Sequence, residues 1–182
     1  MPKKLIFLAP ALLFICGGCD GKKHETLIPQ VVAFDTNRSS LAVAFGTVSE
    51  EAEKLTHRSS QEALAGARRA AVELQSKLAD LELPSELDQL RLAALRRQVE
   101  RLDAAILVHS IRQQWEAALK GAAAGREGLA AKRAELRQRD PAFKALDEKL
   151  LKAESAYKDA ANQLAAVLKA IEEAKKSTKA PS

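Results

Sequence analysis

Histidine and cysteine side chains are the groups of this chain best suited to bind a metal ion or to attack an electrophile. The histidines stand at positions 24, 57 and 109, and no His-x-x-x-His pair occurs. Beyond residue 18 the chain has a single cysteine, Cys19. The spacing therefore predicts no metal site and no cofactor. We expect His109 at the edge of a helical core and His57 on a solvated helix face.

Acid–base and phosphate chemistry have equally little support. Adjacent glutamates at 50–51 and 172–173 would point to different sides of a helix, so they are read as surface charges. The three glycines within 121–128 lie in helical sequence, where they indicate close helix packing or mark a bend, and they form no phosphate-binding loop. The serines at 59–60 are interpreted as a polar step within a helix. We therefore predict no catalytic residue, no enzymatic activity and no small-molecule substrate.

The first nineteen residues hold the most informative pattern in the chain. Two lysines precede an apolar run at residues 5–16, and two glycines then precede Cys19. The run is too short to cross a bilayer, which takes about 20 residues. A basic start, a short apolar stretch and small residues are typical of a secretory signal peptide, here residues 1–18.

Because Cys19 directly follows the small residues, this segment resembles the signal of bacterial lipoproteins, although Cys16 stands where that family usually has leucine. The resemblance implies that signal peptidase II removes residues 1–18 and that Cys19 carries fatty acyl chains such as palmitate. It implies a protein of the bacterial cell envelope, anchored in a membrane and facing the periplasm. Asp20 resembles the signal that retains enterobacterial lipoproteins in the inner membrane. If an aspartate at this position does not act as a retention signal in the source organism, the resemblance implies the outer membrane.

The charge balance argues against nucleic acid as a partner. Removal of residues 1–18 would leave 164 residues with 27 basic and 24 acidic side chains, a net charge of +3. The two signs are interleaved, which is typical of solvated helix faces. The arginine pairs at 68–69 and 96–97 have no aromatic residues between them, so they are interpreted in the same way.

After residue 49 the composition, rich in alanine, leucine and charged residues, is typical of long helices. Pro84 ends a preceding helix, and Ser85 with Asp88 resembles a capping box. Asp140 can cap the next helix, with Pro141 in its first position. The predicted fold class is all-α, an elongated antiparallel coiled coil. Its three long helices are expected at about 48–82, 86–138 and 141–176.

Around this helical domain, taken as 48–176, the remaining chain has little regular pattern. Residues 19–47 are expected to form the lipidated cysteine and a tether or irregular segment, in which 31–45 is either a hairpin or the start of a helix. Residues 177–182 are expected to be a disordered tail.

The second and third helices are predicted to fold back on each other at the turn near residue 140. A repeat of alternating three and four residues pairs Trp115 with Leu164 and Leu129 with Leu150. The residues expected to fill this core are Trp115, Tyr157, Leu129, Leu150 and Leu164.

The first helix is predicted to fold onto the second at Pro84, which pairs Leu74 with Leu95 and Ala67 with Leu102. A second helix of about 53 residues would be about 80 Å long. The result would be a rod that is three helices thick only near residues 99–111.

These features together predict a non-enzymatic scaffold, spacer or partner-binding module, attached to the membrane through Cys19. Its partner would be another protein or a second copy of the chain, because half-covered apolar helix faces favour association. A second hypothesis is a holdase chaperone. The segment VVAFD before a long helix resembles the OmpH/Skp family, which implies trimers that suppress aggregation of outer-membrane proteins. The tail AKKSTKAPS lacks the closing strand of that family.

Overall fold

The computed structural model of the chain describes residues 38–120 and 128–177. Over these two ranges the fold is all-α, with five helices and no strand, so the predicted fold class is confirmed at that level. The segment VVAFD lies outside the described residues. In chain order the helices are α1 (Arg38–Glu53), α2 (Gln61–Ala79), α3 (Glu86–Lys120), α4 (Leu129–Arg139) and α5 (Pro141–Ser177).

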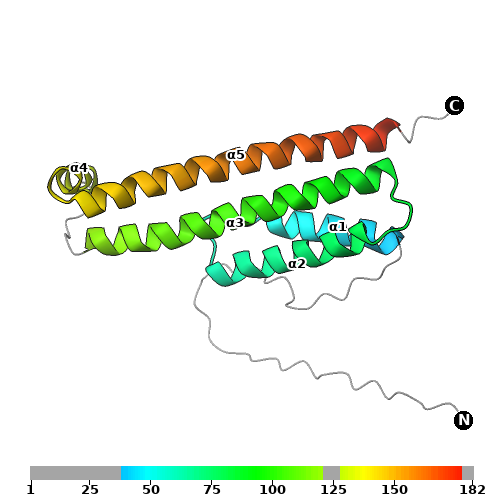
Figure 1. Cartoon of the computed structure of the whole chain (residues 1–182), viewed down its shortest axis with the longest axis horizontal. Coiled ribbons are helices and arrows are strands. Elements are labelled where there is room, and N and C mark those ends of the chain that lie inside the picture. Colours follow the sequence, from blue (N-terminus) through cyan, green and yellow to red (C-terminus); the bar gives the residue numbers. More distant parts are fainter. Residues whose placement is uncertain (1–37, 121–127, 178–182) are drawn as a thin grey trace, which may run out of the picture.

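The two long helices α3 and α5 run antiparallel and pack against each other to form the long axis of the molecule (Figure 1). α2 packs along α3, and α1 packs on α2. α1 and α2 cover only the half of the long pair that includes the turn from α2 to α3 (Figure 1). α4 crosses the start of α5 at the opposite end, where Figure 1 shows it nearly end-on.

The largest core lies in the covered half, where four helices meet. Leu41 of α1, Leu74 of α2, Leu95 of α3 and Ile171 of α5 are each almost fully buried in one cluster. Burying a leucine or isoleucine side chain stabilises the fold by about 1.5–3 kcal/mol. This end of the rod is thus a four-helix core, and the expected two-helix thickness there is wrong.

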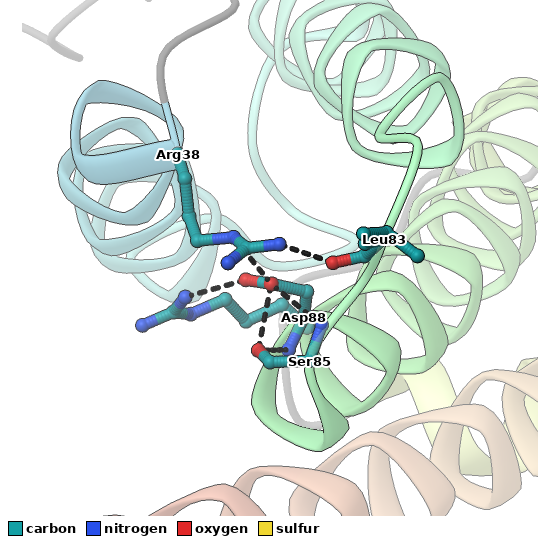
Figure 2. A network of polar contacts seen from close by, with 5 residues as sticks. Arg38, Leu83, Ser85 and Asp88 are labelled. Carbon is teal, nitrogen blue, oxygen red and sulfur yellow. Dashed lines mark hydrogen bonds and ion pairs between the residues drawn. The ribbon is translucent and has the colours of Figure 1, made fainter.

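The capping box at the start of α3 is confirmed. The amide of Asp88 donates to Ser85 Oγ at 3.2 Å, and the amide of Ser85 donates to Asp88 Oδ2 at 3.0 Å. Figure 2 shows that Asp88 also faces Arg38, the first residue of α1, at 3.0 Å between Nε and Oδ2. Arg38 donates in addition to the carbonyl of Leu83, and Arg91 pairs with Asp88 Oδ1 at 3.0 Å. The acidic residue of this capping box, Asp88, therefore fixes the start of α1 against the turn from α2 to α3.

The predicted cap at Asp140 is confirmed as well. Asp140 Oδ1 accepts hydrogen bonds from the amides of Ala142 and Phe143 at 2.9 and 3.2 Å. Pro141 occupies the first position of α5, where its missing N–H costs nothing.

The predicted first helix, 48–82, is wrong at its start and in its middle. α1 already begins at Arg38, so the tether or irregular segment expected over 19–47 is wrong from residue 38 onwards, and for residues 38–45 the alternative that a helix starts there is confirmed. The chain leaves the helix after Glu53 and re-enters it at Gln61. The serines at this break are not a polar step within a helix, because Ser60 caps α2 by accepting from the Ala63 amide at 3.2 Å.

The predicted second helix, 86–138, is also wrong, because α3 ends at Lys120 and α4 begins separately at Leu129. α4 takes a different direction from α3 (Figure 1). With 35 residues, α3 is about 52 Å long rather than about 80 Å. The glycines at 121 and 125 lie outside the described residues.

The register predicted between the second and third helices fails for the same reason. Trp115 stacks near Phe143, with ring centroids 6.3 Å apart, and Leu164 packs instead in the four-helix core. The pairs predicted between the first and second helices agree with the structure. Leu74 and Leu95 share one buried cluster, and Ala67 and Leu102 share the next.

Candidate functional site

An open cleft of about 640 Å³ lies where the cover of α1 and α2 ends. Its walls come from the α1–α2 loop, α3, α4 and α5. The sequence analysis expected no such convergence of polar side chains. The polar residues that bear on its chemistry are His57, Arg58, His109, Arg112, Glu116, Arg133 and Glu154.

The loop wall of the cleft is held in place by a buried arginine. Arg101 of α3 is 7% exposed, and its guanidinium donates to the carbonyls of Ala52 and Leu55 (3.1 Å for Leu55). The Ala52 carbonyl belongs to the last turn of α1 and the Leu55 carbonyl to the loop just after it, where backbone acceptors lack helical partners and the helix dipole favours a positive charge. Arg101 thus acts as the C-terminal cap of α1.

His57 connects this cap to the cleft. Its ring meets the ring of Tyr157 edge-on at 5.2 Å, and Arg101 Nη1 lies 3.4 Å from the Tyr157 hydroxyl, to which it donates. His57 Nδ1 is buried and has no hydrogen-bond partner among the described residues. Burial lowers the pKa of His57, the charge of Arg112 adds to this effect, and Glu154 opposes it. His57 is half-buried at this loop, so the expectation of a solvated helix face is wrong.

The opposite end of the cleft is formed around the fully buried carboxylate of Asp147. Its Oδ1 accepts hydrogen bonds from Trp115 Nε1 and Arg133 Nε, both at 2.8 Å. Arg137 Nη1 lies 3.4 Å from Oδ2. Arg133 also sits 5.6 Å from the centroid of the Trp115 ring. Asp147 therefore joins α3 and α4 to α5.

Two opposing effects set the pKa of Asp147. Burial raises it, while the hydrogen bonds from Arg133 and Trp115 and the charges of Arg133 and Arg137 lower it by more. The pKa of Asp88 is lowered in the same way, because Ser85 and two arginines outweigh the effect of burial. Both carboxylates are therefore ionised at neutral pH.

The remaining charges of the cleft divide into paired and unpaired groups. Arg112 of α3 forms an ion pair with Glu154 of α5. His109 Nε2 lies 2.9 Å from the side-chain amide of Gln113. The exposed guanidinium of Arg58 has no ion-pair partner within 38–120 and 128–177. The loop side of the cleft thus holds the side chains whose hydrogen-bonding capacity is unused.

The residues singled out from the sequence divide into three groups. Cys19 and Asp20 lie outside the described residues, as does the side chain of Leu129. Leu150 and Leu164 are buried, as expected for core residues. Trp115 and Tyr157 are half-buried and pack against the buried clusters, and Trp115 also lines the cleft.

Arg101 and Asp147 were not among the functional residues predicted from the sequence. Asp147 stands four residues after Phe143 and three before Leu150, both buried, so a charged residue on an apolar helix stripe was the available signal. Arg101 carried no such signal, because its role depends on the end of α1, which the sequence did not locate.

Neither a metal site nor a membrane span is found in the described parts of the chain. No group of three or more histidine, cysteine or acidic side chains there could hold a metal ion. None of the helices described combines the length and the apolar character needed to cross a bilayer.

Comparison of the chain with protein-family models, with curated proteins and with solved structures gives no significant match.

Proposed function

We propose that the chain is a lipid-anchored, non-enzymatic helical module of the bacterial cell envelope, which binds a protein partner at the end that carries α4. The observation that carries the proposal is the sequence around Cys19. A basic start, a short apolar run and two glycines precede that cysteine, in the order that a lipoprotein signal requires.

The position of Arg38 supports an oriented attachment. Eighteen residues, 20–37, separate Cys19 from Arg38. Even fully extended, they span no more than about 60 Å. Arg38 is fixed by Asp88 and by the carbonyl of Leu83 at the turn between α2 and α3 (Figure 2). In an anchored protein the tether therefore joins the rod at this end, and α4 and the cleft lie at the opposite end (Figure 1).

The exposed end of the rod offers a surface suited to a partner. The described side chains of α4 are exposed or half-buried, and Leu151 of α5, which lines the cleft together with Arg133 of α4, is 46% exposed. An exposed leucine among arginines is typical of the polar and apolar mixture found in protein interfaces.

Anchoring is tested by two matched serine variants in intact bacteria. The parent chain and Cys16→Ser are expected to incorporate a labelled fatty acid and to fractionate with the membrane. Cys19→Ser is expected to lose the label and to leave the membrane fraction. The anchor is contradicted if Cys19→Ser still fractionates with the membrane and the parent carries no label.

The partner-binding end is tested with a photo-crosslinking amino acid at position 138 of α4. The matched position is 82, an exposed residue in the connection between α2 and α3 at the opposite end. Crosslinks to one reproducible protein, or to a second copy of the chain, are expected from position 138 only. Equal crosslinking from both positions, or none from either, would count against a binding role for the α4 end.

A further inference from the structure

We propose that the cleft between the α1–α2 loop, α3 and α5 binds a small molecule that carries an oxyanion, either a carboxylate or a phosphate. The site is proposed independently of the membrane anchor, because the lining residues that support it all lie within the described ranges.

The loop side of the cleft holds the hydrogen-bond donors that would bind the anion. Arg58 and Arg112 line the cleft there, and His57 lies beside them with a buried Nδ1 that has no hydrogen-bond partner among the described residues. A guanidinium presents several N–H groups in a fixed fork, which matches a carboxylate or a phosphate. Arg58, which has no carboxylate partner in the described ranges, is the donor most available to a ligand.

The carboxylates around the cleft leave these donors available to a ligand. Glu154 is occupied by Arg112, which holds that guanidinium in place. Asp147 is occupied by Arg133, which uses Nε for this bond and lies over the Trp115 ring. Glu116 stands one helical turn beyond Arg112, away from the loop. The donor-rich part of the cleft is therefore the part nearest His57 and Arg58.

The dimensions and the remaining lining favour a small organic anion. A volume of about 640 Å³ falls within the range of about 300–1,000 Å³ that is usual for small-ligand pockets. Trp115, Leu150 and Leu151 provide an apolar part of the cleft wall. Such a wall suits the hydrocarbon or aromatic part of a ligand whose charged group is held by Arg58 and Arg112.

The chain carries its own reporter for binding, since Trp115 is its only tryptophan and lines the cleft. The purified full chain is titrated with benzoate, with inorganic phosphate and with benzamide, the uncharged counterpart of benzoate. Trp115 emission is followed, and calorimetry confirms the stoichiometry. We expect saturable one-to-one binding of benzoate or of phosphate, and binding of benzamide at least about tenfold weaker. Which anion saturates distinguishes a carboxylate site from a phosphate site.

Two arginine variants locate the site. Arg58→Gln is expected to weaken anion binding about tenfold, because one charge-assisted contact is lost, while the melting temperature stays unchanged. Arg58→Lys is expected to retain part of the affinity. Arg96→Gln is the matched control, an exposed arginine of α3 that does not line the cleft, and it is expected to bind as the parent does.

The proposal is overturned if neither anion saturates, if benzamide binds as tightly as benzoate, or if Arg58→Gln and Arg96→Gln have the same affinity. A Cys19→Ser chain should bind the anion like the parent. Loss of the membrane anchor and loss of the anion site are therefore distinguishable results.

Discussion

Trp115 of α3 donates its indole N–H to the fully buried carboxylate of Asp147 on α5, at 2.8 Å. The same oxygen accepts from Arg133 of α4. A single buried acid therefore determines where α4 sits against the long helix pair. Its desolvation is compensated by one neutral and one charged donor, as a buried charge requires.

Asp147→Asn removes the charge at this junction but keeps the size and one acceptor oxygen of the side chain. We expect a loss of about 2 kcal/mol in the free energy of unfolding, because a hydrogen bond to a charged group contributes about 1.5–3 kcal/mol. Urea denaturation followed by Trp115 fluorescence measures this change. Asp159→Asn, at an exposed position of the same helix, is the control and is expected to stay within about 0.5 kcal/mol of the parent.

The stability supplied by Asp147 should depend on pH in a defined direction. Its folded-state pKa is lowered, since the donors outweigh the effect of burial, whereas an unfolded aspartate titrates near 3.9. The contribution is therefore complete above the unfolded pKa and is lost as pH falls through the lowered, folded pKa. The gap in unfolding free energy between parent and Asp147→Asn should be constant from pH 8 to 6 and should shrink below about pH 4. An equal gap at pH 3 and pH 7 would contradict the ionised state of Asp147.

Local signals at helix ends were readable from the sequence. Ser85 and Asp88 form the expected capping box, and Asp140 caps α5 directly before Pro141. These features depend on residues within one helical turn, so no knowledge of tertiary structure was needed.

The continuity and the register of the long helices could not be predicted from the sequence. Alanine and glycine keep an apolar repeat through residues 121–128, so the sequence pattern did not distinguish a continuous helix from two helices at an angle. The assumption of one helix placed Leu164, rather than Phe143, beside Trp115. The cleft depends on this long-range placement, which explains why its residues appeared unrelated along the sequence.

Arg101→Met tests the cap at the end of α1. The methionine keeps much of the apolar stem, but the carbonyls of Ala52 and Leu55 lose the hydrogen bonds that Arg101 donates. We expect a loss of about 1–3 kcal/mol and faster hydrogen exchange in residues 52–60. Arg96→Met on the exposed side of α3 is the control, and similar exchange in the two variants would show that Arg101 does not hold the loop.

Ser85→Ala tests the network at the other end of the molecule. It removes the acceptor for the Asp88 amide and a donor to the Asp88 carboxylate. Loss of an N-terminal cap costs about 1 kcal/mol, and because Asp88 also holds Arg38, hydrogen exchange in the first turn of α1 should rise. Ser155→Ala, at an exposed position of α5, should change neither quantity. If hydrogen exchange in the first turn of α1 is unchanged in Ser85→Ala, the cap of α3 does not contribute to holding α1.

The most direct test of the account is the mass of the amino-terminal peptide of the native protein extracted from bacterial membranes. The account predicts that this peptide begins at Cys19 and carries the added mass of acyl chains. A native chain that retains residues 1–18, or one that begins elsewhere with an unmodified cysteine, would contradict it.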